Sequence, residues 1–333
     1  MRRFFLLSFL LAAFAAIGAT AAALWWVHQP MALSQTPAEL SVEPGTTPRG
    51  VAEAVVRQAG VRTDADLLYA WFRLSGQDRQ IRAGSYEIEA GTTPRGLLAK
   101  LVRGEEALRA VTLVEGWTFR QARQALARAD SLRQDTAAMS DDALMAALGR
   151  AGVAAEGRFF PDTYTYSKGS SDLAVLRRAL HAMDRRLDAA WAQRAPGLPL
   201  KSADEALILA SIVEKETGRE SDRAEISGVF INRLRIGMLL QTDPTVIYGM
   251  GESFDGNLRR RDLQTDTPWN TYTRTGLPPT PIALPGRNAL LAAVQPAQTR
   301  ALYFVSRGDG TSHFSPSLDE HNRAVNRYQR GGR

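Results

Sequence analysis

The sequence contains no cysteine and only four histidines, and this limits the chemistry open to it. A chain without thiols has no disulfide, no thiolate metal ligand and no cysteine nucleophile. The four histidines are too scattered along the chain to predict a metal site. There is also no glycine-rich dinucleotide fingerprint, no phosphate-binding loop and no Gly-x-Ser-x-Gly elbow. We therefore expect no metal and no other cofactor, which leaves acid–base chemistry by carboxyl groups.

Charge of one sign is not concentrated in any block of the chain. Lysine and arginine total 41, aspartate and glutamate total 35, and the two signs are interleaved, for a net charge of +6. Such a pattern gives no reason to expect a nucleic-acid partner. With 333 residues and 44% hydrophobic content, the chain is long enough for about two domains with cores of their own.

The N-terminus carries a long hydrophobic run. Arg2 and Arg3 precede an uncharged apolar stretch, Phe4–Val27, which is long enough to cross a bilayer core of about 30 Å as a helix. The flanking arginines predict a cytoplasmic tail of residues 1–3, with the rest of the chain beyond the anchor outside the cytoplasmic membrane. Ala19–Ala21 resembles a signal-peptide cleavage site, but signal peptides have apolar cores of only about 7–15 residues. We therefore expect residues 4–27 to remain as a single transmembrane anchor.

The stretch after the anchor contains an internal repeat. The six residues Gly45–Gly50 recur unchanged at Gly91–Gly96, and each copy follows a strand-like piece and opens an amphipathic helix. Threonine and proline in each copy suit the N-cap and the first turn of that helix. Residues 65–74 predict a further helix between the copies. The strand–helix–helix–strand order over residues 28–110 resembles a small α+β module of the LysM-like type, which binds glycan chains; a structural spacer is an equal alternative.

The remaining segment, residues 111–333, mixes helical and strand-like patterns. Its helical periodicity predicts helices near 120–128, 173–192, 203–217, 224–237, 287–294 and 318–327; strand patterns predict 111–114 and a hairpin within 301–315. Residues 157–166 are rich in aromatic side chains, which either stack on sugar rings or pack in the core. The chain as a whole is therefore expected to be α+β: one transmembrane helix, a small module and a larger mixed α/β domain.

The helix from Ser202 to Gly218 has signals at both ends. Ser202 suits the N-cap and Glu205, three residues later, completes a capping-box pattern. Gly218 suits a left-handed residue just past the last turn. The segment is therefore expected to fold as one well-defined helix.

Two carboxyl groups near the end of this helix point to opposite sides, because two residues correspond to about 200° of rotation. Glu216 continues the apolar stripe formed by Ile212 and Val213, whereas Glu214 lies on the far side and suits a solvated pairing with lysine. A carboxyl group in an apolar stripe is desolvated, which raises its pKa and suits a general acid. On residues alone, a buried Glu216 with a purely structural role remains the alternative.

Several segments together resemble one family. These are Ile212–Thr217, Val229–Leu234, Leu240–Gly249, Asn270–Tyr272 and Gly276–Pro279. They are similar to the YceG-like endolytic murein transglycosylases, and the resemblance covers essentially the whole chain, including the anchor and the LysM-like module. Thr280 departs from the family, which often has glycine after the paired prolines.

The resemblance implies that Glu216 is the catalytic acid and that residues 111–333 form the catalytic domain. It implies cleavage of the β-1,4 bond between N-acetylmuramic acid and N-acetylglucosamine within peptidoglycan glycan strands, leaving a 1,6-anhydro end and so terminating nascent strands. We expect Gln241, Asp243, Tyr248 and Asn270 to line the substrate cleft; turn-building is an equal alternative for these four.

The resemblance also implies a place in the cell. It places the catalytic domain on the periplasmic side of a single-pass protein of the cell inner membrane, with peptidoglycan synthases as candidate partners. Two other functions stay open. One is a muramidase that uses water and a second acid such as Asp243. The other is a non-catalytic, membrane-anchored scaffold that binds glycan.

Overall fold

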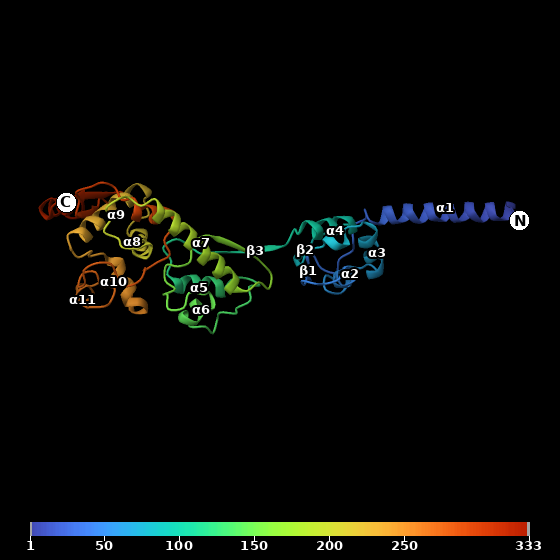
Figure 1. The fold of residues 1–333 in the computed structure, drawn as a ribbon, viewed down its shortest axis with the longest axis horizontal. Helices are drawn as coiled ribbons and strands as arrows, with labels where there is room; N and C mark the ends of the chain where they lie inside the picture. Colours follow the sequence, from blue (N-terminus) through green and yellow to red (C-terminus); the bar gives the residue numbers. More distant parts are fainter. Residues whose placement is uncertain (1, 332–333) are drawn as a thin grey trace. The chain divides into compact units, whose positions relative to one another are not determined.

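The computed structural model describes residues 2–331, and its fold is mixed α+β (Figure 1). The chain forms two compact units. The first comprises Met1–Arg109 with the short segment Tyr166–Gly169, and the second comprises Ala110–Thr165 with Ser170–Arg333. The return of Tyr166–Gly169 to the first unit was not indicated by the sequence pattern.

The first unit begins with α1 (Arg2–Trp26), drawn in blue in Figure 1. Within α1, Phe9–Trp26 is long and apolar enough to cross a membrane, with a mean hydropathy of 1.8 and none of its window buried in the protein. Phe9 and Phe14 are exposed, so nothing within residues 2–331 covers them. An N-terminal apolar helix of the predicted kind is therefore present.

The rest of the first unit is a two-stranded antiparallel sheet packed against helices. The strands are β1 (Ala38–Val42) and β2 (Gly84–Ile88), and the helices are α2 (Pro48–Arg57), α3 (Ala65–Leu74), η1 (Asp78–Gln80) and α4 (Pro94–Arg103). Leu40 pairs with Tyr86 across the sheet, and both side chains are buried in the core. The repeated threonines act as predicted: the Thr47 and Thr93 hydroxyls accept hydrogen bonds from Gly50 N (3.1 Å) and Gly96 N (3.0 Å).

The second unit is mainly helical, with two short sheets. The strands are β3 (Leu108–Thr112) with β4 (Thr163–Ser167), of which residues 110–112 and 163–165 belong to this unit, and β5 (Tyr303–Ser306) with antiparallel β6 (Ser312–Ser315). The helices are α5 (Phe119–Ala127), α6 (Asp141–Ala147), α7 (Asp172–Ala192), α8 (Ala203–Glu216), α9 (Glu220–Arg235), α10 (Asp243–Met250), η2 (Gly251–Ser253), α11 (Arg260–Gln264), α12 (Arg287–Val294), α13 (Leu318–Val325) and η3 (Asn326–Arg330).

Helix α8 lies at the centre of this unit and packs against α7, α9, α10 and α12. Its residues Leu207, Leu209, Ile212 and Val213 are fully buried. Burying a side chain of this size contributes about 1.5–3 kcal/mol, so packing rather than propensity holds α8 in place. The aromatic segment 157–166 also belongs to the core, since its Phe and Tyr side chains are buried, which favours the packing interpretation over sugar stacking.

The ends of α8 differ from expectation in two details. The Ser202 hydroxyl accepts from Glu205 N (3.2 Å) as predicted, but the Glu205 carboxylate accepts from Lys201 N (2.6 Å) rather than from Ser202. The prediction of a left-handed Gly218 is wrong. The helix ends at Glu216 and its C-cap, Thr217, has an extended backbone (φ −148°), so the chain leaves the helix without a left-handed residue.

Candidate functional site

Glu216 is the last residue of α8 and lies in a pocket of about 370 Å³. The pocket is lined by Glu216, Arg233, Leu240, Gln241, Asp243, Tyr272, Tyr303, Phe304, Leu318 and His321. These residues come from α8, α9, α10, α13, β5 and the loops that lead into α10 and past Asn270. A carboxyl group at a helix end thus meets a polar cavity built from segments that are distant in sequence.

The surroundings of Glu216 favour its protonated form. Burial raises the pKa of Glu216, and the nearby Asp243 raises it further, whereas the Thr242 hydroxyl and Arg233 act in the opposite direction. The largest of these effects is desolvation, as expected for a carboxyl group that continues a buried stripe. A partly buried acid of this kind holds a proton that it can deliver to a leaving group.

Thr242 holds the Glu216 carboxyl group in position. It is 2% exposed and occupies the N-cap of α10, where a threonine side chain normally bonds to its own helix. Here its hydroxyl donates instead to Glu216 Oε1. The Thr242 side chain therefore does not cap α10. It bonds to Glu216 instead and so fixes the rotamer of Glu216 against α10.

Gln241 and Asp243 line the same pocket as Glu216. Gln241 has a positive φ of 51°, a conformation that costs a non-glycine residue free energy and that occurs often at functional sites. Asp243 is exposed and accepts a hydrogen bond from the Tyr272 hydroxyl (2.5 Å). Burial, with Asp243, raises the pKa of Tyr272, so this hydroxyl stays a donor. Both predicted residues are placed where they can contact a ligand.

Asn270 and Tyr248 lie elsewhere. Asn270 is fully buried, and its side-chain amide donates to the carbonyls of Asp262, Leu263 and Thr265. The Tyr248 ring packs edge-on against Trp269, with 5.5 Å between centroids. Neither residue lines the Glu216 pocket. The contacts of Asn270 fit the turn-building alternative, and those of Tyr248 are packing contacts.

Glu214 does not have the solvated environment that the helical pattern suggested. Its side chain is 6% exposed and forms an ion pair with Arg223 (3.2 Å), not with lysine. It also accepts a hydrogen bond from Gly286 N (2.9 Å) at the N-cap of α12. The expectation was wrong because the helix face opposite the apolar stripe is covered by α9 and α12. Glu214 thus connects three helices.

Arg233, Tyr303 and His321 are among the pocket residues that the sequence reasoning did not propose. Arg233 stands inside a segment that carried the family resemblance, which was a usable signal. Tyr303 and His321 lie near the C-terminus, about 90 and 105 residues after Glu216, and no local pattern connects them with it.

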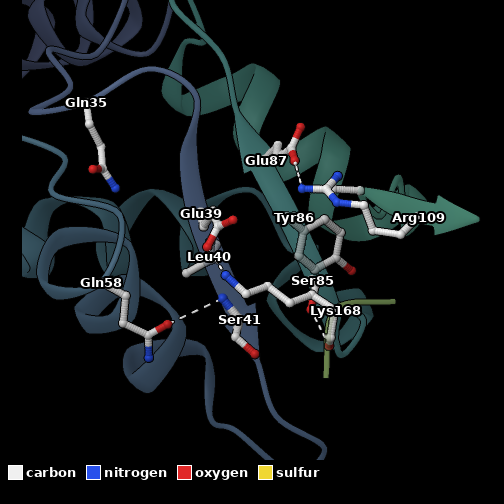
Figure 2. A pocket seen from close by; sticks show the side chains of 11 residues that line it. Gln35, Glu39, Leu40, Ser41, Gln58, Ser85, Tyr86, Glu87, Arg109 and Lys168 are labelled. Atoms are coloured by element: carbon white, nitrogen blue, oxygen red, sulfur yellow. Dashed lines mark hydrogen bonds and ion pairs between the residues drawn. The ribbon is translucent and has the colours of Figure 1, made fainter. Parts of the chain in front are cut away.

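A second pocket, of about 250 Å³, lies in the first unit beside β1 and β2 (Figure 2). Glu39 and Glu87 stand opposite each other on the two strands, and each is paired with a cation, Glu39 with Lys168 and Glu87 with Arg109 (2.8 Å). The remaining lining is largely polar, including Gln35, Gln58, Ser41 and Ser85. The pocket lining therefore contains both charged side chains and uncharged hydrogen-bonding groups.

Comparison with known proteins places the chain in a family. A sequence model of the YceG-like family matches residues 40–327. The chain belongs to the YceG-like family. The matched range covers most of both units, so the assignment does not depend on the Glu216 segment alone.

Curated relatives of this YceG-like chain carry one shared name. This chain is 37% identical to the endolytic murein transglycosylase of Bacillus subtilis over 173 residues. The aligned residues make up 52% of this chain and 48% of that protein. This chain is 31% identical to the endolytic murein transglycosylase of Streptococcus pneumoniae over 176 residues. The aligned residues make up 51% of this chain and 31% of that protein. The chain thus spans about half or less of the length of these relatives.

A solved structure supports the same assignment. The crystal structure of a yceG-like protein from Listeria monocytogenes aligns with a TM-score of 0.54 and 26% sequence identity. The alignment covers 86% of this chain and 97% of the other. The YceG-like fold therefore extends over nearly the whole of the Listeria protein.

Proposed function

We propose that this chain is an endolytic lytic transglycosylase that cleaves the glycan strands of peptidoglycan. The observation that carries the proposal is the environment of Glu216, a desolvated carboxyl group fixed by Thr242 at the wall of a polar pocket. The relatives named endolytic murein transglycosylases support the same activity. The substrate bond is the β-1,4 linkage between N-acetylmuramic acid and N-acetylglucosamine.

In the proposed reaction Glu216 acts first as an acid and then as a base. Its proton goes to the glycosidic oxygen as the bond from that oxygen to C1 of the muramic acid breaks. The resulting carboxylate takes the proton of the C6 hydroxyl on the same sugar, and O6 bonds to C1. The product is a 1,6-anhydro end, no water is consumed, and Glu216 is protonated again.

A single carboxyl group is sufficient because the nucleophile belongs to the substrate. Intramolecular attack by a well-oriented group can have an effective molarity of about 10⁵–10⁸ M. Most glycosidases instead need a second carboxyl group to activate water or to attack the sugar. Gln241 and Asp243 are proposed to bind and orient the sugar beside Glu216, and Asp243 adds negative charge near the positive charge that develops at C1.

Placement of the enzyme in the cell is part of the proposal. Helix α1 is proposed to remain as a single-pass anchor in the cell inner membrane, with Glu216 on the periplasmic side. The first unit, with its strand–helix–helix–strand order, is proposed to be a LysM-like module whose polar pocket contacts glycan (Figure 2). Termination of nascent strands beside peptidoglycan synthases follows from this placement, and co-purification from solubilised membranes tests it.

A muramidase is the second candidate, favoured by the position of Asp243. This carboxyl group is exposed, lines the same pocket as Glu216, and is oriented by the Tyr272 hydroxyl. It can in principle activate a water molecule for hydrolysis, as the second carboxyl group of a glycosidase does.

The products separate the two reactions. Purified full-length protein in detergent is incubated with uncrosslinked glycan strands in water enriched in heavy oxygen, and the new ends are identified by mass spectrometry. A transglycosylase gives unlabelled anhydro ends, whereas a muramidase gives labelled reducing ends. Binding without any new ends favours a non-catalytic scaffold.

A further inference from the structure

The pocket wall beside Glu216 contains a buried positive charge without a carboxylate partner. Arg233 is 7% exposed, and its Nε and Nη1 donate to the carbonyls of Leu302 (2.7 Å), Leu240 (2.6 Å) and Leu239 (3.2 Å). Within residues 2–331 no carboxylate forms an ion pair with Arg233, and its Nη2 has no hydrogen-bond partner. Because a buried cation is costly without an opposing charge, this wall is suited to an anion.

His321 stands next to this cation and is also incompletely bonded. Its ring stacks on Tyr303 with 5.3 Å between centroids, and the Arg233 guanidinium lies over the same Tyr303 ring at 5.2 Å. Nδ1 of His321 is buried and has no hydrogen-bond partner among the residues that the structure describes. Burial, with Arg233 and His313, lowers the pKa of His321, so the imidazole is neutral at neutral pH and has one N–H to donate.

We propose that Arg233 and His321 form a carboxylate-binding subsite that receives a carboxylate of the muramyl residue next to the scissile bond. This rests on the glycan-cleaving function proposed above. Guanidinium and imidazole N–H groups match the two oxygens of a carboxylate and form strong, charge-assisted hydrogen bonds with them. Two sources carry this group: the lactyl side chain, once the stem peptide has been removed, and the stem peptide itself.

The subsite also connects binding to acid catalysis. Arg233 favours the ionised form of Glu216 and so opposes the protonated form that the first step requires. A carboxylate bound to Arg233 offsets this influence. Substrates that carry the anion therefore favour the protonated form of Glu216 more strongly than neutral glycan does.

The test compares four substrates and two variants of the full-length protein in detergent. The substrates are strands with stem peptides, strands stripped to free lactyl carboxylates, and each of these after methyl esterification. His321→Phe keeps an aromatic ring on Tyr303 without a donor, and His321→Gln keeps an N–H. We expect His321→Phe to raise KM about tenfold or more on the preferred carboxylate strand only, with partial rescue in His321→Gln.

The results identify the source and can overturn the subsite. Preference for stripped strands assigns the lactyl carboxylate, and preference for peptide-bearing strands assigns the stem. If wild-type KM is unchanged by esterification, or if His321→Phe lowers kcat equally on all four substrates, the subsite is wrong. If wild type cleaves none of the four, the proposed function fails instead.

A binding measurement covers the case in which the His321 variants do not fold. Glu216→Gln leaves Arg233 and His321 in place and removes turnover. It should bind the preferred carboxylate strand about tenfold more tightly than its methyl ester. Equal affinity for the two strands contradicts the subsite.

Discussion

The Thr242 hydroxyl and the apolar end of α8 act on Glu216 in opposite directions. Desolvation raises the pKa of Glu216, and the hydrogen bond from Thr242 lowers it, because a donor stabilises the carboxylate. The same bond fixes the carboxyl group in the pocket. The bond from Thr242 therefore fixes the position of Glu216 while making its protonated form less favoured, and the two effects can be separated by mutation.

Thr242→Val tests this balance through the pH dependence of kcat/KM. The proposed reaction requires protonated Glu216, so we expect activity to fall as the pH rises through the pKa of Glu216. Removing a donor that lowers this pKa should move the alkaline limb to higher pH, while Thr242→Ser, which keeps the hydroxyl, should leave the limb in place. An alkaline limb that moves to lower pH in the valine variant contradicts the assignment.

Glu214→Gln separates the two carboxyl groups of α8. The variant leaves Arg223 without its charged partner, so we expect a loss of about 1–3 kcal/mol in the free energy of unfolding. Activity per folded molecule should fall less than in Glu216→Gln, because Glu214 lies among α9 and α12 rather than in the pocket. Urea unfolding and turnover are measured on the same samples. Stability unchanged with activity lost would place Glu214 in the chemistry.

At the scale of secondary-structure elements, the sequence predicts the helices whose own residues carry a capping or periodicity signal. Thr47 and Thr93 cap their helices, and the apolar stripe of α8 identifies its buried face. Helix α10 was missed because Asp243-Pro244 reads as a turn and its N-cap hydroxyl bonds to Glu216 instead. Its helical state depends on tertiary contacts that no local pattern contains.

The residues of the candidate site also differ in whether a local sequence pattern indicates their position. The desolvated setting of Glu216 was predictable because helix periodicity alone places this residue in the apolar stripe. Asn270 and Tyr248 were not distinguished from Gln241 and Asp243, since polar residues in a turn have the same composition whether they bind a ligand or each other. His321 joins the pocket only through the packing of α13 beside β5.

The buried Glu156 of the second unit should make the free energy of unfolding depend on pH. It is 9% exposed and accepts from Phe119 N (2.9 Å) at the start of α5, and burial raises its pKa from 4.5 to about 7. The folded protein thus binds more protons than the unfolded chain between these values. Its contribution to stability is greatest below about pH 4.5 and is lost as the pH rises through about 7.

Glu156→Gln should therefore stabilise the protein at alkaline pH by on the order of 3 kcal/mol and have little effect at acidic pH. Denaturant unfolding of both proteins across this range measures the difference. A stability difference that does not change with pH would show that Glu156 does not titrate in this window.

At the scale of the whole molecule, the proposed function includes a membrane anchor formed by α1. We predict that the mature protein in the membrane fraction retains its N-terminus, and intact-mass or N-terminal analysis checks this. A mature chain that begins near Ala22 would instead identify a cleaved signal peptide.

The central claim is that one desolvated carboxyl group performs the cleavage, and Glu216→Gln tests it most directly. The measurement is the yield of 1,6-anhydro ends from uncrosslinked glycan, with thermal unfolding and glycan binding recorded on the same protein. We predict an unchanged fold, retained binding and a loss of anhydro ends of about 10²-fold or more. Anhydro ends at the wild-type yield from the folded variant would contradict the account.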